Sequence, residues 1–193
     1  MTSAAPIATR HGTFVAQFND TGLCRLDFPG KAGTPKAAPP PTGLAKCWLA
    51  ATAGALESLL LGQAPRRLPP IDLSDGTDFQ QSVWRQLLKI QPGQTRSYGE
   101  IAGRLAKPGA SRAVGSACGA NPIPVIVPCH RVLAAHRRIG GFSGGPGWKQ
   151  RLLRIEQADF IGGVIPFLQK SSRGFVTLRR ANASPVAEHD FHS

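Results

Sequence analysis

The chain has 193 residues, 41% of them hydrophobic and 18% charged, and its formal net charge is +12 at pH 7. This length allows one ordinary domain or two small ones with a proper core, so neither disulfides nor metals have to be assumed for stability. The first ten residues lack the apolar core of a signal peptide, and no run approaches the roughly 20 apolar residues of a membrane span. We therefore expect an intracellular, cytoplasmic protein in a reducing compartment, with no membrane partner.

The beginning of the chain predicts a β-hairpin followed by a loop. Two short, partly alternating runs at 13–18 and 23–28 flank the turn residues 19–22, a pattern typical of two antiparallel strands. The next stretch, 29–43, holds five prolines and three glycines. This composition argues against a helix and indicates an irregular loop.

A helix and a linker are predicted next. Residues 44–61 are rich in alanine and leucine, contain no proline and are followed by Gly62, which favours a helix that ends there. Residues 63–76 contain three prolines and are typical of a linker. We place a domain boundary in this linker.

Two capping boxes mark helix starts in the second half of the chain. In 77–80 (TDFQ) and in 97–100 (SYGE), a hydroxyl side chain is followed three positions later by Gln or Glu. Each partner of such a pair satisfies a free backbone N–H group at the start of a helix. We expect the first helix to run to about residue 90, before a Pro-Gly pair, and the second through Ala106.

A third helix is expected over 111–118, after a short turn that contains glycine. Two short helices joined in this way predict a helix-turn-helix, although a helical pair that serves only packing has the same pattern. The third helix carries mostly small side chains, with Arg112 as its one long side chain. We therefore expect weak sequence preference and an affinity dominated by phosphate contacts.

The positive charge is concentrated in one block of the sequence. Residues 1–84 have 7 basic and 6 acidic side chains, residues 85–155 have 12 and 1, and residues 156–193 have 4 and 4. A block with twelve cations and only Glu100 as a carboxylate repels itself unless a polyanion is near. Nucleic acid is therefore the expected partner of this block.

The segment 128–132 (PCHRV) places a cysteine directly before a histidine and an arginine. Such neighbours stabilise a thiolate, so Cys129 is a candidate reactive thiol. A small buried hydrophobic residue is the alternative role of a free cysteine. The irregular spacing of the four cysteines, without a C-x-x-C pair, argues against structural zinc; they are Cys24, Cys47, Cys118 and Cys129.

The last part of the chain predicts a glycine-rich loop and one more helix. The segment 140–147 allows the backbone to pass close to whatever occupies a pocket, although such a segment is commonly only a loop. The following amphipathic helix is expected to place Trp148, Leu152 and Ile155 on one face, with Glu156 next to it.

Together these segments resemble the O6-alkylguanine-DNA alkyltransferases, also called methylated-DNA–protein-cysteine methyltransferases. The resemblance covers about residues 76–157, in the family's order and spacing, and it is specific because many weak motifs coincide. A fainter similarity covers 13–28, which resembles the family's N-terminal sheet. The matching segments are Gly76-Thr77-x-Phe79-Gln80, Val83-Trp84, Ser97-Tyr98-Gly99-Glu100-Ile101-Ala102, Arg112-Ala113-Val114-Gly115, Asn121-Pro122, Pro128-Cys129-His130-Arg131-Val132, Ser143-Gly144-Gly145 and a helix from Lys149 to Glu156.

The resemblance implies an α+β protein with three parts. Residues 1–75 would form a small ribonuclease-H-like α/β domain with the Pro-rich loop and linker. Residues 76–157 would form a mostly helical, winged helix-turn-helix alkyltransferase domain. Residues 158–193 would be a C-terminal extension beyond the family's usual end, which we expect either to fold or to stay disordered.

The resemblance also implies an activity, namely stoichiometric and irreversible repair of double-stranded DNA. The alkyl group of O6-alkylguanine would pass to the protein's own Cys129, with O4-alkylthymine as a second candidate substrate. The protein would act as a monomer and would need no cofactor and no metal.

Four residues around the thiol receive catalytic roles from the resemblance. Cys129 would accept the alkyl group, and His130 would act as its base through a bound water. Glu156 would orient the histidine, and Asn121 would brace the turn that carries the cysteine.

Other residues receive roles in holding the DNA. Tyr98 would act in DNA binding and in catalysis, because it would help to rotate the target nucleotide and offer its hydroxyl to the leaving guanine. Arg112 would fill the vacated place in the base stack, and Lys107 would contact the DNA. The pocket for the flipped base would be lined by Val132, Phe142 and Ser143.

Four positions depart from the family pattern. Phe142 stands where a tyrosine is common, which removes one pocket hydroxyl. The segment 134–138 replaces a glycine-containing turn, and we expect it either to add a phosphate contact or to strain the hairpin. Gln91 replaces a common proline, and Cys118 adds a second thiol to the helix expected to face DNA.

Other functions stay open from the sequence alone. A binding-only relative that flags alkylated bases would lack the acceptor cysteine, whereas this chain retains Cys129. A cysteine hydrolase using Cys129 and His130 would have no use for the helix-turn-helix or its charge. A transcription factor would need a recognition helix with more base-reading side chains.

Overall fold

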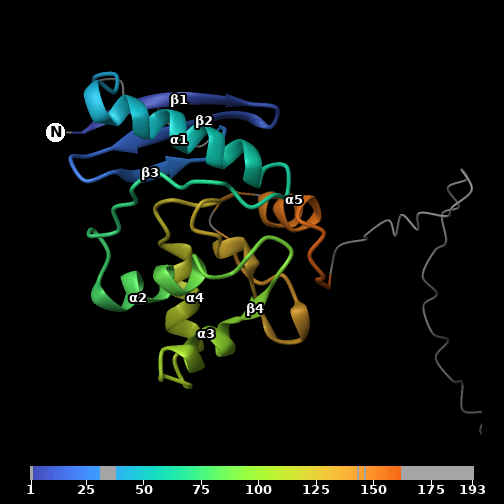
Figure 1. Ribbon diagram of the computed structural model, residues 1–193. Coiled ribbons are helices and arrows are strands. Elements are labelled where there is room, and N and C mark those ends of the chain that lie inside the picture. The colour runs from blue at the N-terminus through green and yellow to red at the C-terminus, as the bar shows by residue number, and fades with distance from the viewer. Residues whose placement is uncertain (1, 31–37, 143, 146, 162–193) are drawn as a thin grey trace, which may run out of the picture. The chain divides into compact units, whose positions relative to one another are not determined.

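Figure 1 shows the computed structural model, which describes residues 2–30, 38–142, 144–145 and 147–161. These residues belong to one compact unit that ends at Gly163. The described residues form a mixed α/β fold with a small antiparallel sheet and five α-helices. Within the same ranges, no helix has the length and apolar character needed to cross a membrane.

The N-terminal part is a three-stranded antiparallel sheet in the order β1-β2-β3. Strands β2 (Gly12–Phe18) and β3 (Leu23–Asp27) form the predicted hairpin. Strand β1 (Ser3–Thr9) pairs with β2 along its whole length and has no counterpart in the sequence-based prediction. Its small residues and Pro6 give no strand pattern, and proline is tolerated because β1 lies at the sheet edge.

Helix α1 (Gly43–Leu59) confirms the helix predicted at 44–61 and packs against β1 and β2. Gly62 follows it in the left-handed conformation, with φ 74°. The linker at 63–76 is irregular, and it returns to the sheet where Ile71 bridges to Leu23. This linker brings the chain from the sheet to the second group of helices.

The second part of the chain contains four short helices and a pair of two-residue strands. Both predicted capping boxes are present, from Thr77 to Gln80 and from Ser97 to Glu100. The first of these helices ends at Leu87, before the predicted end near residue 90. The elements are α2 (Asp78–Leu87), β4 (Arg96–Ser97), α3 (Tyr98–Arg104), α4 (Ser111–Gly119), the 3₁₀ turn η1 (Cys129–Arg131), β5 (Val132–Leu133), the 3₁₀ turn η2 (Ala135–Arg137) and α5 (Trp148–Ile155).

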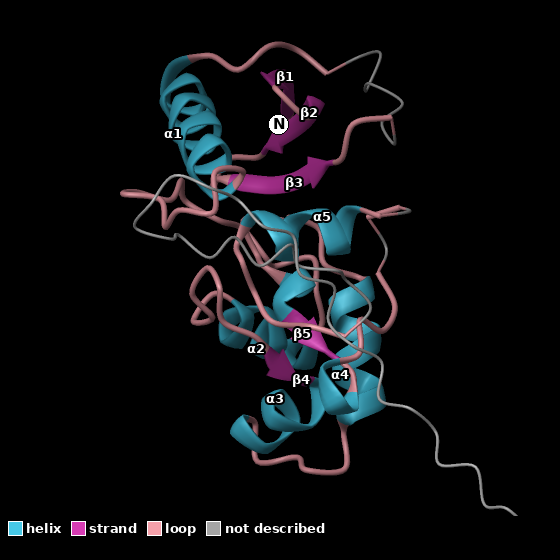
Figure 2. Ribbon diagram, turned by 90° about the vertical axis from the view of Figure 1, so that its right-hand side faces the viewer, coloured by secondary structure: helices cyan, strands magenta, loops and turns pink. Residues whose placement is uncertain are grey.

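Helices α3 and α4 pack against each other and against α2, and Figure 2 shows α3 at the end of the unit farthest from the three-stranded sheet. Helix α4 buries Val114, Ala117 and Cys118. Its exposed face carries Arg112 and small residues such as Ala113. The outer surface of α4 is therefore smooth, as its sequence predicts.

One apolar core connects the sheet with the helices of the second part. The buried cluster includes Phe14 and Leu26 from the sheet as well as Val83, Ile101 and Val114 from three helices. The Leu26 N–H also donates to the Pro122 carbonyl over 2.9 Å. The predicted division between residues 75 and 76 stays a prediction, and the two parts share a core across it.

Helix α5 packs two residues of the predicted face, Trp148 and Leu152, against the core, and it also buries two residues outside that face. Lys149, Leu152 and Leu153 are buried, whereas Trp148 and Ile155 are only half-buried. A buried lysine is unexpected in an amphipathic pattern, because burial of an ammonium group is costly unless it finds partners. The prediction assigned the apolar residues to one face and overlooked Lys149.

The first residues of the predicted C-terminal extension are packed. Gln157 turns the chain with φ 55°, and Ala158 and Phe160 then contact Leu133 and Leu153 in a second apolar cluster. The remainder of the predicted extension, 162–193, lies outside the described residues.

The backbone of the turn at 134–138 is strained, which was one of the two consequences expected for this segment. His136 and Arg137 have φ angles of 57° and 56°, which residues with a Cβ adopt at a cost. The C-terminal segment stabilises the turn, because Ile161 N–H donates to the Arg137 carbonyl over 2.9 Å and Asp159 forms an ion pair with the Arg137 guanidinium.

We predict that Gly62→Ala destabilises the fold by more than the roughly 1–2 kcal/mol that a left-handed conformation costs an L-residue. A Cβ at residue 62 would lie 2.5 Å from the carbonyl oxygen of Ile155 in α5. Gly54→Ala is the matched control, because Gly54 lies in α1 facing open space, and it should stabilise by about 0.5–1 kcal/mol. Urea unfolding measures both; equal effects would contradict the close contact.

Candidate active site

Cys129 begins the 3₁₀ turn η1 directly after Pro128, at the sharp junction that the sequence predicts. Its N–H donates to the Val127 carbonyl over 2.8 Å, and the residue is only 3% exposed. Asn121 holds the preceding loop: its Nδ2 donates to the Val127 carbonyl over 2.7 Å, and its Oδ1 accepts from the Ile123 N–H. Asn121 therefore fixes the loop that leads into the thiol.

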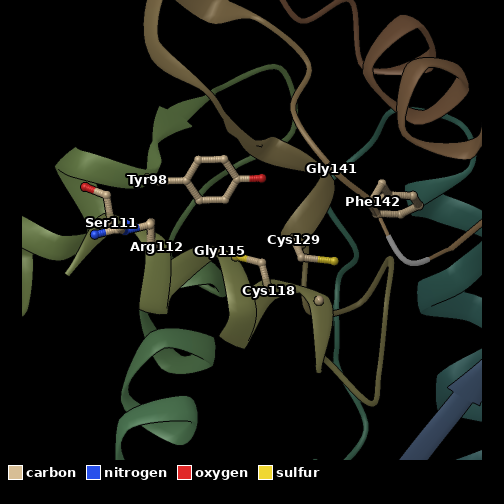
Figure 3. Close-up of a pocket in the computed structure, with 9 residues that line it drawn as sticks. Tyr98, Ser111, Arg112, Gly115, Cys118, Cys129, Gly141 and Phe142 are labelled. Carbon is tan, nitrogen blue, oxygen red and sulfur yellow. The ribbon is translucent and has the colours of Figure 1, made fainter.

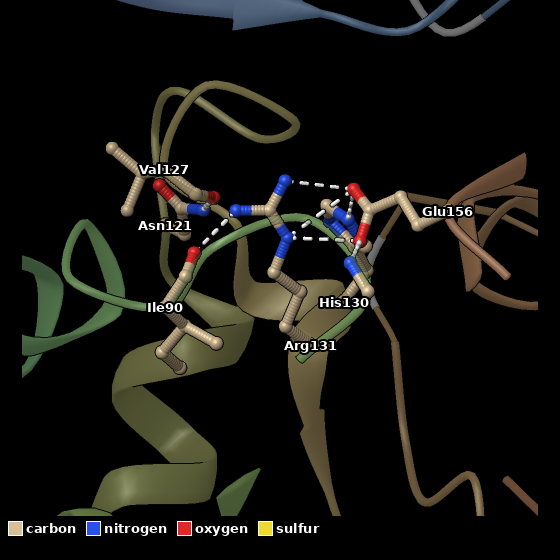
Figure 4. Close-up of polar contacts among 7 residues, drawn as sticks. Ile90, Asn121, Val127, His130, Arg131 and Glu156 are labelled. Atoms are coloured by element: carbon tan, nitrogen blue, oxygen red, sulfur yellow. Dashed lines mark hydrogen bonds and ion pairs between the residues drawn. The ribbon is translucent and has the colours of Figure 1, made fainter. Parts of the chain in front are cut away.

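The two residues after Cys129 share one buried carboxylate, as Figure 4 shows. His130 Nε2 lies 2.9 Å from Glu156 Oε1, and Arg131 donates to both Glu156 oxygens through Nε and Nη2. The remaining Arg131 nitrogen, Nη1, donates to the Ile90 carbonyl after α2. These contacts tie η1, the end of α5 and the end of α2 together.

The charges in this network determine which nitrogen of His130 carries a proton. Burial would raise the pKa of Glu156, but hydrogen bonds from His130 and Arg131 outweigh burial and lower the pKa to about 2. Burial lowers the pKa of His130 despite the opposing effect of Glu156, so the imidazole is neutral at pH 7. Since Glu156 is ionised and only accepts, Nε2 carries the proton. Nδ1 is then an unprotonated base, buried without a hydrogen-bond partner in the described structure.

A cavity of about 630 Å³ opens beside the thiol. Figure 3 shows Tyr98 and Phe142 on opposite sides of the Cys129 side chain. Arg112 and Gly115 reach the cavity from α4, so the predicted helix pair and the thiol face the same space. The lining residues are Tyr98, Ser111, Arg112, Gly115, Cys118, Gly119, Cys129, Gly141 and Phe142.

Lys149 brings a buried positive charge close to this cavity. Its Nζ donates to the Val132 carbonyl over 2.7 Å and lies 5.8 Å from the centre of the Tyr98 ring. Burial lowers the pKa of Lys149 to about 8, and the thiols Cys129 and Cys118 oppose this shift. Lys149 has no predicted role, although it lies three residues before Leu152 and seven before Glu156 on one helix face, a spacing that could have indicated its burial.

The thiols and the tyrosine hydroxyl stay protonated in the free protein. Burial raises the pKa of Cys129, although Asn121 and Lys149 favour its thiolate. Burial and the neighbouring Cys129 raise the pKa of Cys118 to about 12. Burial is the main cause that raises the pKa of Tyr98 to about 12, so its hydroxyl is a hydrogen-bond donor.

Two of the residues predicted to contact the DNA or the flipped base, Val132 and Lys107, do not line the cavity. Val132 is fully buried in β5 and contributes its carbonyl to Lys149. Lys107 lies in the turn between α3 and α4, with Nζ 5.2 Å from the centre of the Phe79 ring. Ser143 lies outside the described residues. In the described ranges, no three His, Cys, Asp or Glu side chains come together as metal ligands would.

Residues 78–158 match the family model of the 6-O-methylguanine DNA methyltransferase DNA-binding domain. A methylated-DNA–protein-cysteine methyltransferase of Mycobacterium tuberculosis is 57% identical over 83 residues, which are 43% of this chain and 50% of that relative. The chain thus spans about half the length of this curated relative.

Solved structures extend the similarity beyond this segment. The structure of Mycobacterium tuberculosis OGT in complex with DNA is 37% identical, with a TM-score of 0.69 over 80% of this chain and 92% of that one. An O6-methylguanine-DNA methyltransferase from Pyrococcus kodakaraensis, 24% identical with a TM-score of 0.58, shares the fold over 82% of this chain and 100% of that one. The chain belongs to the methylated-DNA–protein-cysteine methyltransferase family, because it matches 92% of the length of a relative with 37% sequence identity.

Proposed function

We propose that this protein repairs alkylated DNA by transferring the alkyl group of O6-alkylguanine in duplex DNA to Cys129, with O4-alkylthymine as a second substrate. The observation that carries the proposal is the shared cavity. It brings a thiol with an adjoining neutral histidine base together with side chains from both helices of the predicted helix-turn-helix. A hydrolase would need the thiol and base but would not need these helices.

The chemistry is an in-line displacement at the alkyl carbon. The Cys129 sulfur forms a bond to this carbon while the bond to guanine O6 breaks, and the guanine takes up a proton. Both reactants are supplied by the protein and the DNA, so the reaction needs no cofactor. The product is a thioether without a good leaving group, and each protein molecule therefore acts once.

The site residues would divide the proton movements between them. His130 Nδ1 would take the thiol proton through a bound water, while Glu156 holds the other ring nitrogen. The Lys149 ammonium would favour the thiolate once it forms, since it opposes the effect of burial on the Cys129 pKa. Tyr98 would offer its hydroxyl to the departing guanine as a hydrogen-bond donor, since its raised pKa keeps the hydroxyl protonated.

DNA would approach the side of the unit formed by α3 and α4. We assign these helices to a helix-turn-helix, and β4, β5 and the 134–138 turn to its wing, in a 76–157 domain that follows a ribonuclease-H-like part. The smooth α4 surface would lie against the duplex, with Arg112 in the place of the flipped base. Lys107 and the turn at 134–138 would contact phosphates, and Phe142 with Ser143 would border the flipped base.

The proposed alkyl transfer also bears on the oligomeric state of the protein and on the compartment in which it acts. A single chain carries every group that the transfer uses, so we propose that the protein acts as a monomer. The acceptor has to be a free thiol, which a reducing intracellular compartment maintains.

We predict that the protein gains one methyl group when mixed with a duplex that holds one O6-methylguanine. Intact mass measures this gain, and excess duplex should not increase it beyond one group per molecule. The tryptic peptide 113–131 contains both Cys118 and Cys129, so fragmentation of this peptide has to locate the group on Cys129.

Two variants complete this test. Cys129→Ala should gain no methyl group, and Cys118→Ala should gain it as the unchanged protein does. An unmodified protein bound to an unrepaired duplex would instead support a binding-only function. Continued steady turnover would contradict the single-use reaction.

We predict that Glu156→Gln shifts the pH dependence of alkyl transfer. The transfer rate of the unchanged protein should fall as pH drops through the His130 pKa, which burial lowers from the ordinary 6.5. Glu156 partly opposes that lowering, so its removal should move the acid limb to still lower pH and reduce the plateau rate.

Rapid-quench rates at a series of pH values test this prediction. The substitution also leaves Arg131 buried without its counter-charge, at a stability cost of about 3–5 kcal/mol, so the assay is run well below the melting temperature. Glu100→Gln is the matched control. Glu100 is exposed, belongs to the capping box of α3 and is not part of the His130 network. An acid limb that stays in place or moves to higher pH would contradict the proposed coupling.

We predict that Arg112→Ala slows transfer from duplex DNA by about tenfold or more, because the cost of unstacking a base is a few kcal/mol. Transfer from the free base O6-benzylguanine should keep its rate, since no base has to be extruded. Arg104→Ala, which removes an equal charge from the exposed side of α3, should have a smaller effect on the duplex reaction. Equal slowing with duplex and free base would rule out the assigned role of Arg112.

A further inference from the structure

An aromatic cluster connects the N-terminal sheet with the wall of the Cys129 cavity. Phe14 in β2 lies 5.6 Å from Phe28, measured between ring centres, and 5.6 Å from Trp148 at the start of α5. Phe28 follows β3 and lies 4.7 Å from Trp148. The cluster ends on Phe142, whose ring lies 5.9 Å from Phe28 at an interplanar angle of 69°.

Phe142 is the member of this cluster that lines the cavity. It lies in the segment 140–147, in which five of eight residues are glycine. Glycines bring no side chains to hold this segment in place, and their backbone is the least restricted. Phe142 also lacks the hydroxyl of a tyrosine, so its ring has no hydrogen bond to fix it. Lys149 Nζ donates to the carbonyl of the preceding Gly141, and the Phe142 ring itself is held by its contact with the Phe28 ring.

Gly144 indicates that the contact between the two rings is close. A Cβ at residue 144 would overlap ring atoms of both Phe142 and Phe28. The backbone at this point therefore passes against the junction of the two rings. Phe28 itself is only 2% exposed and Phe14 is fully buried. The side chain that Phe142 contacts is therefore itself packed in the core.

We propose that Phe28 is a positioning residue that sets the selectivity of the alkyl-binding cavity through Phe142. The proposal rests on the proposed function, because it concerns which alkyl groups reach Cys129. A Phe142 ring pressed from behind by Phe28 keeps the cavity narrow and holds a small alkylated base close to the thiol. The N-terminal sheet, which contributes no residue to the cavity lining, thereby takes part in substrate choice.

The test compares two duplexes of one sequence that carry either O6-methylguanine or O6-benzylguanine. In Phe28→Ala, the rate with the methyl substrate should fall by about tenfold, the scale expected when a reacting group is misplaced by less than 1 Å. The rate with the benzyl substrate should fall less, because the loosened wall leaves more room. The ratio of methyl to benzyl rates therefore falls.

Phe18→Ala is the matched control. Phe18 is fully buried in the same sheet, and the substitution deletes the same side chain without touching Phe142. It should lower stability but leave the rate ratio unchanged. Phe28→Leu, which retains apolar volume, provides a folded variant with a smaller shift of the ratio if Phe28→Ala does not fold.

A double-substitution cycle decides whether Phe28 acts through Phe142. Adding Phe28→Ala to Phe142→Ala should not change the ratio further, because the ring that Phe28 supports is already absent. An unchanged ratio in the Phe28 variants, an equal change in Phe18→Ala or a full additional change in the double variant would overturn the proposal. Failure of the unchanged protein to accept either alkyl group would refute the proposed function instead.

Discussion

The buried carboxylate of Glu156 holds the site together. It accepts hydrogen bonds from His130 and Arg131, and Arg131 also donates to the Ile90 carbonyl. A buried arginine is tolerated only with a counter-charge, and a buried carboxylate needs several donors, so each group makes the other possible. Burial keeps His130 neutral against the effect of Glu156, and the contact of Glu156 with Nε2 leaves Nδ1 free. The position at which α5 ends therefore determines the chemistry available beside Cys129.

Burial gives Cys129 two properties that fit the proposed single alkyl transfer. The thiol is protonated and almost inaccessible in the free protein, because burial raises its pKa. It is thus protected from unwanted reactions until a substrate enters the cavity. Lys149 supplies a positive charge that favours the thiolate, while the low pKa of Lys149, about 8, reflects the cost of keeping an ammonium there. Reactivity in this site depends on charges arranged around a buried sulfur more than on solvent exposure.

Local signals predicted those parts of the structure that depend on neighbouring residues in sequence. The capping boxes at Thr77 and Ser97 located two helix starts, and the β2–β3 hairpin followed from its turn. The pairing of Glu156 with His130 came from family resemblance, since no local pattern joins residues 26 positions apart. Strand β1 was missed because it is an edge strand with a proline, and Lys149 because its partners, the Val132 carbonyl and the Tyr98 ring, come together only in the fold. The support of Phe142 by Phe28 is equally nonlocal.

The proposed chemistry depends most on His130 being a neutral base whose Nε2–H is held by Glu156. Nitrogen-15 NMR of histidine-labelled protein measures this directly, because the ring-nitrogen shifts distinguish protonated from unprotonated positions. The chain has five histidines, so comparison with His130→Gln identifies the relevant signals. At pH 7 we expect a protonated Nε2 and an unprotonated Nδ1. A doubly protonated ring, or a ring with its proton on Nδ1, would contradict it.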